Sequence, residues 1–495
     1  MGVIARQSIK TLVVEVIGIV IGFFSMLFIY PLEDSLFGFM QFLFSFGIFL
    51  VPIMSLGLPS FVIKFNPFYQ NVEGAKNSFL TILVLLSFFL FFLFIGLALV
   101  FKTPIYSFLS NLNFDVALIR QNANYLLIIG FLQIQIALFT SYLSNFGKIA
   151  LPTLIFQTGY KLFLPLAVLA YVYNYYDFKY APLYLIGFLA LVLVILIIYS
   201  HREKLFFFTK KILIPPAKKI KEMLSFLSFS SLTSISNLLA FRIDMIMIAS
   251  LLSLQANGIY AKILIIASII DLPTKILSRT ASPEISRAWE ILDMNRIQSI
   301  YKKSSLNLFL LGSFLFILLW FILGDLISIS SNPASFENGQ LIFLFLGIGK
   351  LIDLIASVNK SIIGYSPSYK INFLLIAFLG IVNVVLNYFL IGRFEVVGAA
   401  ISTGISLLLY NVIKLCYILY KYKMHPFTKE LLVIIMVGVF TFITMSFIPF
   451  FSNSFLNLFL KSFLILLLFG IPILILKPSL ELVESYQKIV QRLKR

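Results

Sequence analysis

The stretch "NLLAFRIDMIMIAS", Asn237–Ser250, decides the fold, because it is an apolar run that contains two charged residues, Arg242 and Asp244. Apolar runs of this kind predict a helix that lies in lipid or in a protein core. A charge inside such a helix is costly unless a partner or a wet cavity holds it. Residues two apart on a helix point about 200° apart, so Arg242 and Asp244 are predicted not to pair with each other.

The composition of the whole chain indicates that its solvent is lipid. Of the 495 residues, 60% are hydrophobic and 12% are charged, and the mean hydropathy is +1.03. About fourteen runs reach the roughly 20 apolar residues that cross a bilayer, and lipid requires such spans to be helical. The predicted fold class is therefore an all-α integral membrane protein with about fourteen transmembrane helices. The runs are 11–30, 37–58, 79–100, 124–144, 150–173, 182–200, 224–250, 256–278, 305–324, 339–362, 371–391, 397–419, 430–450 and 456–476.

The basic residues are distributed unevenly between the connections. With the N-terminus inside, 27 of the 38 Lys and Arg residues fall in internal connections and 4 in external ones. The positive-inside rule then places both termini in the cytoplasm. The longest internal connection contains Pro215-Pro216 and divides the chain, which suggests two pseudo-symmetric six-helix lobes and two additional helices. The predicted parts are a first lobe (1–200), a basic cytoplasmic linker (201–222), a second lobe (223–420), two additional transmembrane helices (421–476) and a cytoplasmic amphipathic tail (477–495).

Charged side chains at membrane depth are the candidate binding residues, because such groups usually face the interior of the bundle or a wet cavity. The candidates are Arg242, Lys350, Lys161, Lys262, Asp244 and Asp353. The basic members outnumber the acidic ones, so a cavity that they line is cationic and suits an anionic ligand. The alternative is that these groups only cross-link helices. Asp244 and Lys262 lie at similar depth on adjacent spans, Lys350 and Asp353 share a helix face, and so do Asp271 and Lys275. The charged residues within about two turns of a span end have a simpler interpretation, which is that their side chains reach the membrane surface; these are Glu15, Lys275, Lys414 and Lys461.

Enzymatic chemistry is not expected from this chain. The external connections are short, so they offer no outer domain for catalysis. The stretch "GIGKL", Gly347–Leu351, lacks the earlier glycine and the Ser or Thr after the lysine that a phosphate-binding loop needs. The single cysteine excludes an internal disulfide, and the two histidines have no metal-ligand spacing. We predict no cofactor and no nucleic-acid partner, because most of the positive charge lies at the inner membrane surface.

One further segment is predicted to lie on the inner surface of the membrane. In "SPEISRAWEILDMNR", Ser282–Arg296, Ser282 can cap a helix and Pro283 suits its first position. Ile285, Trp289 and Leu292 share one face of that helix. The sequence therefore predicts a separate amphipathic helix that starts at Ser282.

Several stretches together resemble one family of transporters. They are "RQSIKTLVVEVIGIVIGFFSMLFIYPL" (6–32), "LGLPSFVIKFNP" (56–67), "FRIDMIMIASLLSLQANGIYAKILIIASIIDLPTKILSRTASPEIS" (241–286), "GKLIDLIASVNKSIIGYSPSYKINFLL" (349–375) and "VNVVLNYFLIGRFEVVGAAISTGIS" (382–406). On these stretches the chain resembles the bacterial oligosaccharide flippases, the O-antigen and capsule lipid-linked sugar exporters. That family belongs to the multidrug/oligosaccharidyl-lipid/polysaccharide exporter superfamily. Arg242, Lys350 and Asn359 fall within the matching stretches, whereas Lys161 does not.

The resemblance implies a two-lobed bundle that alternates between inward-open and outward-open states in the bacterial cytoplasmic membrane. An undecaprenyl-pyrophosphate oligosaccharide would cross through the central cavity, with Asn359 added to the candidate cavity residues. The expected partners are this lipid-linked oligosaccharide, membrane lipid and a polysaccharide polymerase or chain-length regulator, and the expected state is a monomer. Coupling to Na⁺ or H⁺ stays open. The alternatives are a lipid II flippase, a cation-coupled multidrug exporter of the same fold, and a membrane glycosyltransferase or polymerase, which would need a large external loop.

The charge asymmetry makes a direct prediction about topology. An alkaline-phosphatase fusion after residue 495 should be inactive, because that reporter needs the oxidising side of the membrane to form its disulfides. A fusion near Gln255, after the seventh span, should be active. Activity at residue 495, or its absence near Gln255, would contradict the predicted orientation.

Overall fold

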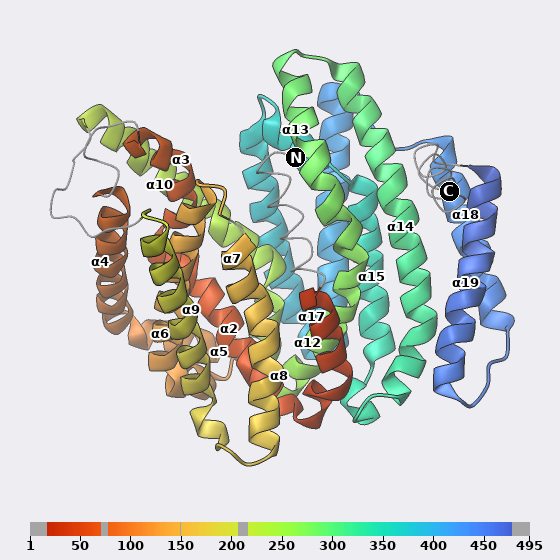
Figure 1. Cartoon of the computed structure of the whole chain (residues 1–495), viewed down its shortest axis with the longest axis horizontal. Coiled ribbons are helices and arrows are strands. Elements are labelled where there is room, and N and C mark those ends of the chain that lie inside the picture. The colour runs from red at the N-terminus through yellow and green to blue at the C-terminus, as the bar shows by residue number, and fades with distance from the viewer. Residues whose placement is uncertain (1–16, 71–77, 149, 206–215, 478–495) are drawn as a thin grey trace. The chain divides into compact units, whose positions relative to one another are not determined.

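The computed structural model describes residues 17–70, 78–148, 150–205 and 216–477, and every element within them is helical (Figure 1). Internal contacts divide the chain into two units, Met1–Ala261 (unit 1) and Lys262–Arg495 (unit 2). The boundary falls inside α12 (Leu254–Ala267). Each unit is described by itself.

Unit 1 begins with the helical residues 17–28 and continues to the first half of α12. Its other elements are η1 (Tyr30–Leu32), α2 (Asp34–Ser55), α3 (Leu58–Gln70), α4 (Ser78–Val100), α5 (Lys102–Asn111), α6 (Val116–Ser144), α7 (Ala150–Pro152), the π-helical η2 (Thr153–Thr158), α8 (Gly159–Val172), η3 (Phe178–Tyr180), α9 (Ala181–Arg202), α10 (Ala217–Phe241) and α11 (Ile243–Leu251).

Unit 2 begins with the second half of α12. Its other elements are η4 (Ser268–Asp271), α13 (Leu272–Glu290), α14 (Met294–Ser328), η5 (Pro333–Phe336), α15 (Gly339–Ala356), α16 (Asn359–Tyr365), α17 (Tyr369–Tyr422), α18 (Lys429–Phe447) and α19 (Ser454–Leu476).

Twelve helices in the described part of the chain are long and apolar enough to cross a membrane. One of them, Lys370–Tyr422, contains two helices that meet at Glu395, where φ is 49° and ψ is −130°. The shorter apolar helix Ile17–Leu32 matches the first predicted run, of which residues 11–16 lie outside the described residues. The prediction of an all-α membrane fold with about fourteen helices is therefore confirmed. The chain is a multi-pass membrane protein.

In unit 1, polar contacts join connections that the sequence predicts on the same side of the membrane. Lys148 and Glu203 form an ion pair at 2.9 Å between two predicted internal connections. The Asp115 N–H donates to the Ser250 carbonyl at 2.7 Å, which ties two predicted external connections together. Figure 1 shows α3 at one end of unit 1 and the connection between α8 and α9 at the other. These contacts are the ones that helices of alternating direction would make, and the side on which each connection lies stays a prediction.

The prediction of a separate surface helix starting at Ser282 is wrong. α13 starts ten residues earlier in the chain, at Leu272, and runs through Pro283. Ile285 is fully buried, and the Trp289 indole N–H donates to the Ile362 carbonyl at 3.0 Å. Ile285 and Trp289 are therefore buried against the rest of the unit, whereas Leu292 of the predicted stripe is 66% exposed.

In unit 1, the backbones of α2 and α12 approach closely at Gly38. A Cβ atom on Gly38 would lie 1.7 Å from the Leu254 carbonyl oxygen, so no other residue fits there without a shift of backbone. Asn257 Nδ2 fastens the crossing by donating to the Gly38 carbonyl at 2.8 Å. Small residues let helix backbones approach within a membrane, where van der Waals contact drives helix association. This crossing positions the segment of α12 that carries Tyr260.

The predicted arrangement of two six-helix lobes and two additional helices stays a prediction. Two Leu-Pro pairs, at residues 58–59 and 272–273, each begin a helix, α3 and α13, as a duplicated lobe would require. Residues 206–215 of the predicted linker and 478–495 of the predicted amphipathic tail lie outside the described residues.

Candidate substrate-binding site

Arg242 lies at a break between two helices. α10 ends at Phe241 and α11 begins at Ile243, and between them Arg242 has a non-helical φ of −140° and ψ of −11°. The prediction of one helix over 224–250 is therefore wrong at this residue. The half-buried Arg242 side chain lies within electrostatic range of Tyr160 on α8. On a continuous helix, the preceding turn restricts the rotamers of a side chain. At a break this restriction is weaker, so the guanidinium can adopt more orientations, which suits a ligand-binding role.

Asp244 is held by a tyrosine and by the start of its own helix. The residue is 4% exposed, and its Oδ2 atom accepts a hydrogen bond from the Tyr260 hydroxyl at 2.5 Å. Its Oδ1 atom accepts from the Met245 N–H at 2.9 Å. A carboxylate in the first turn is favoured by the helix dipole, and its local hydrogen bond competes with a continuous helix. Asp244 therefore gives a physical reason for the break. Its predicted pairing with Lys262 stays a prediction.

Lys161 lies on α8 against the helical residues 17–28. A Cβ atom on Gly18 would lie 3.3 Å from Lys161 Cδ and 3.4 Å from Lys161 Nζ, so the glycine makes room for the lysine. The lysine is half-buried and directly follows Tyr160, which lies within electrostatic range of Arg242. Arg242 thus interacts electrostatically with the residue that precedes Lys161 in the chain.

In unit 2, Lys350 forms an ion pair with Asp271. Lys350 lies on α15 and Asp271 ends η4, so the pair joins segments that are distant in sequence. Their side chains are 15% and 33% exposed, which leaves the pair partly accessible. The sequence associated Asp271 with Lys275, whose side chain lies outside the described residues.

Asp353 and Asn359 belong to one hydrogen-bond network with Asn411. Asn411 Nδ2 donates to Asp353 Oδ1 at 3.0 Å, and Asn359 Nδ2 donates to Asn411 Oδ1 at 3.4 Å. The network joins α15, α16 and the second half of α17. Its geometry depends on close backbone approach, because a Cβ atom on Gly349 of α15 would lie 3.0 Å from the Cα atom of Gly404 on α17. The structure thus brings two predicted site residues together through a third that the sequence analysis missed.

Lys414 is a buried cation in the same part of unit 2. It is 1% exposed, and its Nζ atom lies 4.1 Å from the centre of the Tyr410 ring, a cation–π distance. It follows Asn411 by three residues on α17 and interacts electrostatically with Asp353. The nearness of Lys414 to the end of its span had suggested that it reaches the membrane surface, and that interpretation is wrong. Helix packing, not distance from the span end, decides its environment.

Lys262 is fully buried on α12. Its ammonium group donates to the Ser335 carbonyl at 2.7 Å and to the Ser335 hydroxyl, and it lies 4.6 Å from the centre of the Phe336 ring. These contacts hold η5 against α12. They favour the cross-linking alternative for this lysine, and its contact with a substrate stays a prediction.

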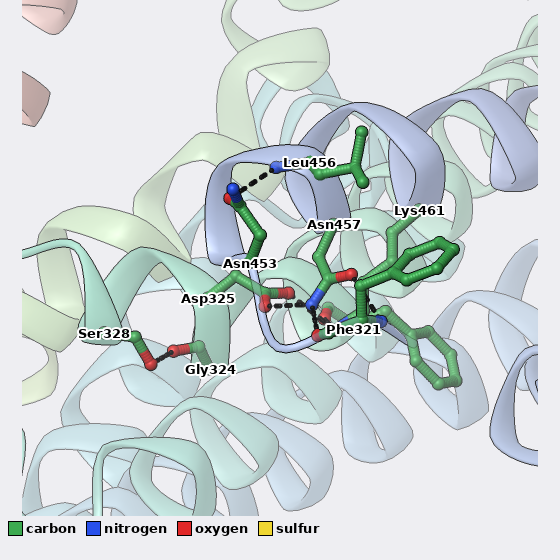
Figure 2. A network of polar contacts seen from close by, with 9 residues as sticks. Phe321, Gly324, Asp325, Ser328, Asn453, Leu456, Asn457 and Lys461 are labelled. Atoms are coloured by element: carbon green, nitrogen blue, oxygen red, sulfur yellow. Dashed lines mark hydrogen bonds and ion pairs between the residues drawn. The ribbon is translucent and has the colours of Figure 1, made fainter. Parts of the chain in front are cut away.

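A further ion pair fixes α19 to α14 (Figure 2). Lys461 Nζ lies 2.5 Å from Asp325 Oδ2 and donates to the Phe321 carbonyl at 3.1 Å. Asn457 Nδ2 donates to Asp325 Oδ1 at 3.1 Å and to the Phe451 carbonyl at 2.7 Å. Both charged side chains are nearly buried, so this network is a structural clamp for the last helix. Lys461 had been expected to reach the membrane surface, and Asp325 was not among the expected intramembrane acids.

Within the described residues, no group of three or more His, Cys, Asp or Glu side chains could hold a metal ion. The polar clusters of this chain are built instead from Lys, Asp, Asn and Tyr.

Comparison with known proteins identifies the fold. No family model matches the chain, and no curated protein matches it. Among solved structures, the lipid II flippase MurJ in an inward closed conformation matches with a TM-score of 0.68, at 16% identity, over 95% of this chain and 98% of that one. A multidrug resistance MATE transporter of the MOP superfamily matches in its inward-facing conformation with a TM-score of 0.59, at 13% identity, over 86% of this chain and 98% of that one. The chain has the fold of the MurJ and MATE transporters. This is the fold that the resemblance implies.

The Tyr260–Asp244 hydrogen bond should stabilise unit 1. Replacing Tyr260 with Phe removes the donor and leaves a buried carboxylate oxygen without it, at a cost of about 1–3 kcal/mol. We expect Tyr260→Phe and Asp244→Asn each to lower the melting temperature of the purified protein in detergent. The double variant should lose less than the sum of the two, because the residues are in contact. Tyr365→Phe, at an exposed position, is the matched control and should melt like the wild type. Strictly additive losses would show that the bond is energetically unimportant.

Proposed function

We propose that this chain flips lipid-linked oligosaccharide repeat units, carried on undecaprenyl pyrophosphate, across the bacterial cytoplasmic membrane for the synthesis of a surface polysaccharide. The observation that carries the proposal is the fold shared with a lipid II flippase over 95% of the chain. The stretches that resemble oligosaccharide flippases support the choice of substrate. The proposal includes cytoplasmic termini, a monomer and, as a partner, the polymerase or chain-length regulator that receives the exported unit.

The intramembrane charges suit an anionic head group. Arg242 and Lys161 are both half-buried residues of unit 1, and Lys350 is partly accessible in unit 2. A pyrophosphate can accept two charge-assisted hydrogen bonds from one guanidinium, and each is stronger than a neutral bond. The planar fork of Arg242 matches two phosphate oxygens at once, which a lysine cannot do. We assign Arg242 and Lys350 to the pyrophosphate, and Lys161 to the positive field around it.

Two rival functions share this fold. A lipid II flippase is favoured by the MurJ match itself. A cation-coupled multidrug exporter is favoured by the MATE match, but it should present deep acidic groups in its first lobe. In the predicted first lobe (1–200), Glu15 is a shallow acid that lies outside the described residues, and Asp34 is the buried acid among the described ones. Asp244 is also buried in unit 1 but belongs to the predicted second lobe. Asp34 lies at the start of α2, and Asp244 already accepts hydrogen bonds from Tyr260 and Met245, so neither is poised for a drug cation.

Deletion of the gene should separate these functions. We expect the deletion strain to accumulate completed, lipid-linked repeat units on the inner face of the membrane and to lose surface polysaccharide. Cell-wall synthesis should continue, because under this proposal the chain does not carry lipid II. The measurement is extraction of lipid-linked intermediates together with labelling of surface glycan. Arrested cell-wall synthesis with accumulated lipid II would favour the lipid II function. A repeat unit that is never completed would rule out flipping altogether.

Arg242 should be needed for export and not for folding. Arg242→Ala should abolish export at normal membrane abundance, and Arg242→Lys should weaken it, because lysine keeps the charge but loses the two-point geometry. The measurement is surface polysaccharide in a deletion strain that carries each variant, normalised to the amount of membrane protein. Asp244→Asn is the comparison: it should lower stability or turnover more than substrate binding. Full export by Arg242→Ala would leave this arginine with a structural role only.

A further inference from the structure

The connection between α8 and α9 is rich in tyrosine. It reads "YNYYDFKYAPLY", Tyr173–Tyr184. It lines a cleft with a volume of about 510 Å³ whose walls are Asn174, Asp177, Leu183 and four tyrosines. The charge asymmetry predicts this connection on the outer side of the membrane. No function described so far uses these residues.

Backbone hydrogen bonds fix the first wall of the cleft. α8 ends with Asn174 in the left-handed conformation, with φ of 59°. The Asn174 N–H donates to the Tyr171 carbonyl, and the Tyr175 N–H donates to the Ala170 carbonyl, each at 2.9 Å. This pattern is the Schellman helix end, which asparagine tolerates better than most residues. Tyr175 is therefore held in place by its backbone, although its side chain is 79% exposed.

Tyr176 forms a rigid floor. Its hydroxyl donates to the Ala167 carbonyl at 2.9 Å, and its ring centre lies 4.3 Å from that of Tyr184 on α9. Burial raises the pKa of the Tyr176 phenol to about 12, so the hydroxyl stays protonated and remains a donor. The cleft thus joins α8 to α9 and is formed before any ligand arrives, which lowers the entropy cost of binding.

The lining combines apolar ring faces with a few polar atoms that accept and donate hydrogen bonds. A pyranose ring has the matching character: one face of C–H groups that can lie on an aromatic ring, and hydroxyl groups around its edge. The Asp177 carboxylate and the Asn174 amide can bind those hydroxyls. Asp177 lies 3.4 Å from Lys179, so the local charges largely cancel.

These features argue against two simpler roles. A site for an anionic lipid head group would be lined by several basic residues, and Asp177 in the wall opposes an anion. A belt of tyrosines that only anchors the protein at the membrane surface needs no cleft.

We infer that the cleft is a saccharide-binding site, which holds the neutral sugars of the exported repeat unit as they reach the outer side of the membrane. This inference rests on the proposed function for the identity of its ligand.

Binding of free sugar tests the site without the transport cycle. The probe is the repeat-unit oligosaccharide released from the host's own surface polysaccharide, without lipid or phosphate. Purified full-length protein is titrated with it by saturation-transfer NMR. Tyr175→Ala should weaken binding by up to about tenfold, the size of one aromatic contact, and Tyr175→Trp should retain it. Asp177→Ala should also weaken binding. Tyr173→Ala is the matched control, because Tyr173 is 70% exposed in the same connection but does not line the cleft.

The sugar-binding measurement and the deletion strain test the saccharide site and the proposed function separately. Weaker binding by Tyr175→Ala and Asp177→Ala, with Tyr173→Ala unchanged and all variants melting like the wild type, supports the site. Equal binding by wild type and Tyr175→Ala, or no binding by wild type at millimolar sugar, overturns it and leaves an interfacial anchor. The deletion strain tests flipping independently: blocked export together with unaltered sugar binding by the cleft variants would sink this inference alone.

Discussion

A charged side chain in a membrane-spanning helix needs a polar partner, and this requirement determines many of the contacts between the helices. Asp325 forms an ion pair with Lys461, and Lys350 forms one with Asp271. Asp244 accepts a hydrogen bond from Tyr260. Polar contacts between membrane helices contribute only about 0.6 kcal/mol on average, because an unfolded chain in lipid also finds partners. The larger effect is the penalty when a buried charge loses its partner, about 3–5 kcal/mol. Such pairs therefore act mainly by excluding packings in which they are apart, and so they specify how the helices are arranged.

The spans were predictable from sequence, and the breaks within them were less so. Hydropathy is a local property, and bilayer thickness fixes the length of a span, so about fourteen helices could be predicted without any tertiary information. The break at Arg242 was not predicted, because apolar residues on both sides continue the hydropathic pattern across it. The kink at Glu395 was anticipated only as a connection between two runs. A helix break in lipid depends on which side chains satisfy the backbone there, and that is settled by tertiary structure.

For the candidate site, the charged residues were predictable from sequence and their contacts were not. Its charged residues could be found by composition alone, since any ionisable group in a span is a candidate. Their partners could not. Asn411 meets Asp353 because Gly349 and Gly404 let two backbones approach, and nothing in the sequence links glycines that far apart. Lys414 was misjudged for a related reason: depth was estimated from the end of the span, whereas its burial depends on the neighbouring helices.

The different ways in which the cations are held bear on how a flippase could release its substrate. A head group bound by several unopposed cations would be held too tightly to leave. Lys350 already has an intramolecular anion, Asp271. Under the proposed function, a pyrophosphate would compete with that carboxylate for the ammonium group, and the carboxylate would bind the ammonium again on release. Arg242 lies instead at a helix break, where a small change in backbone angles redirects its guanidinium. Under the proposed function, affinity is therefore limited in unit 2 by a competing carboxylate and in unit 1 by geometry. Both are properties of single residues, which makes the balance between binding and release adjustable without any change of fold.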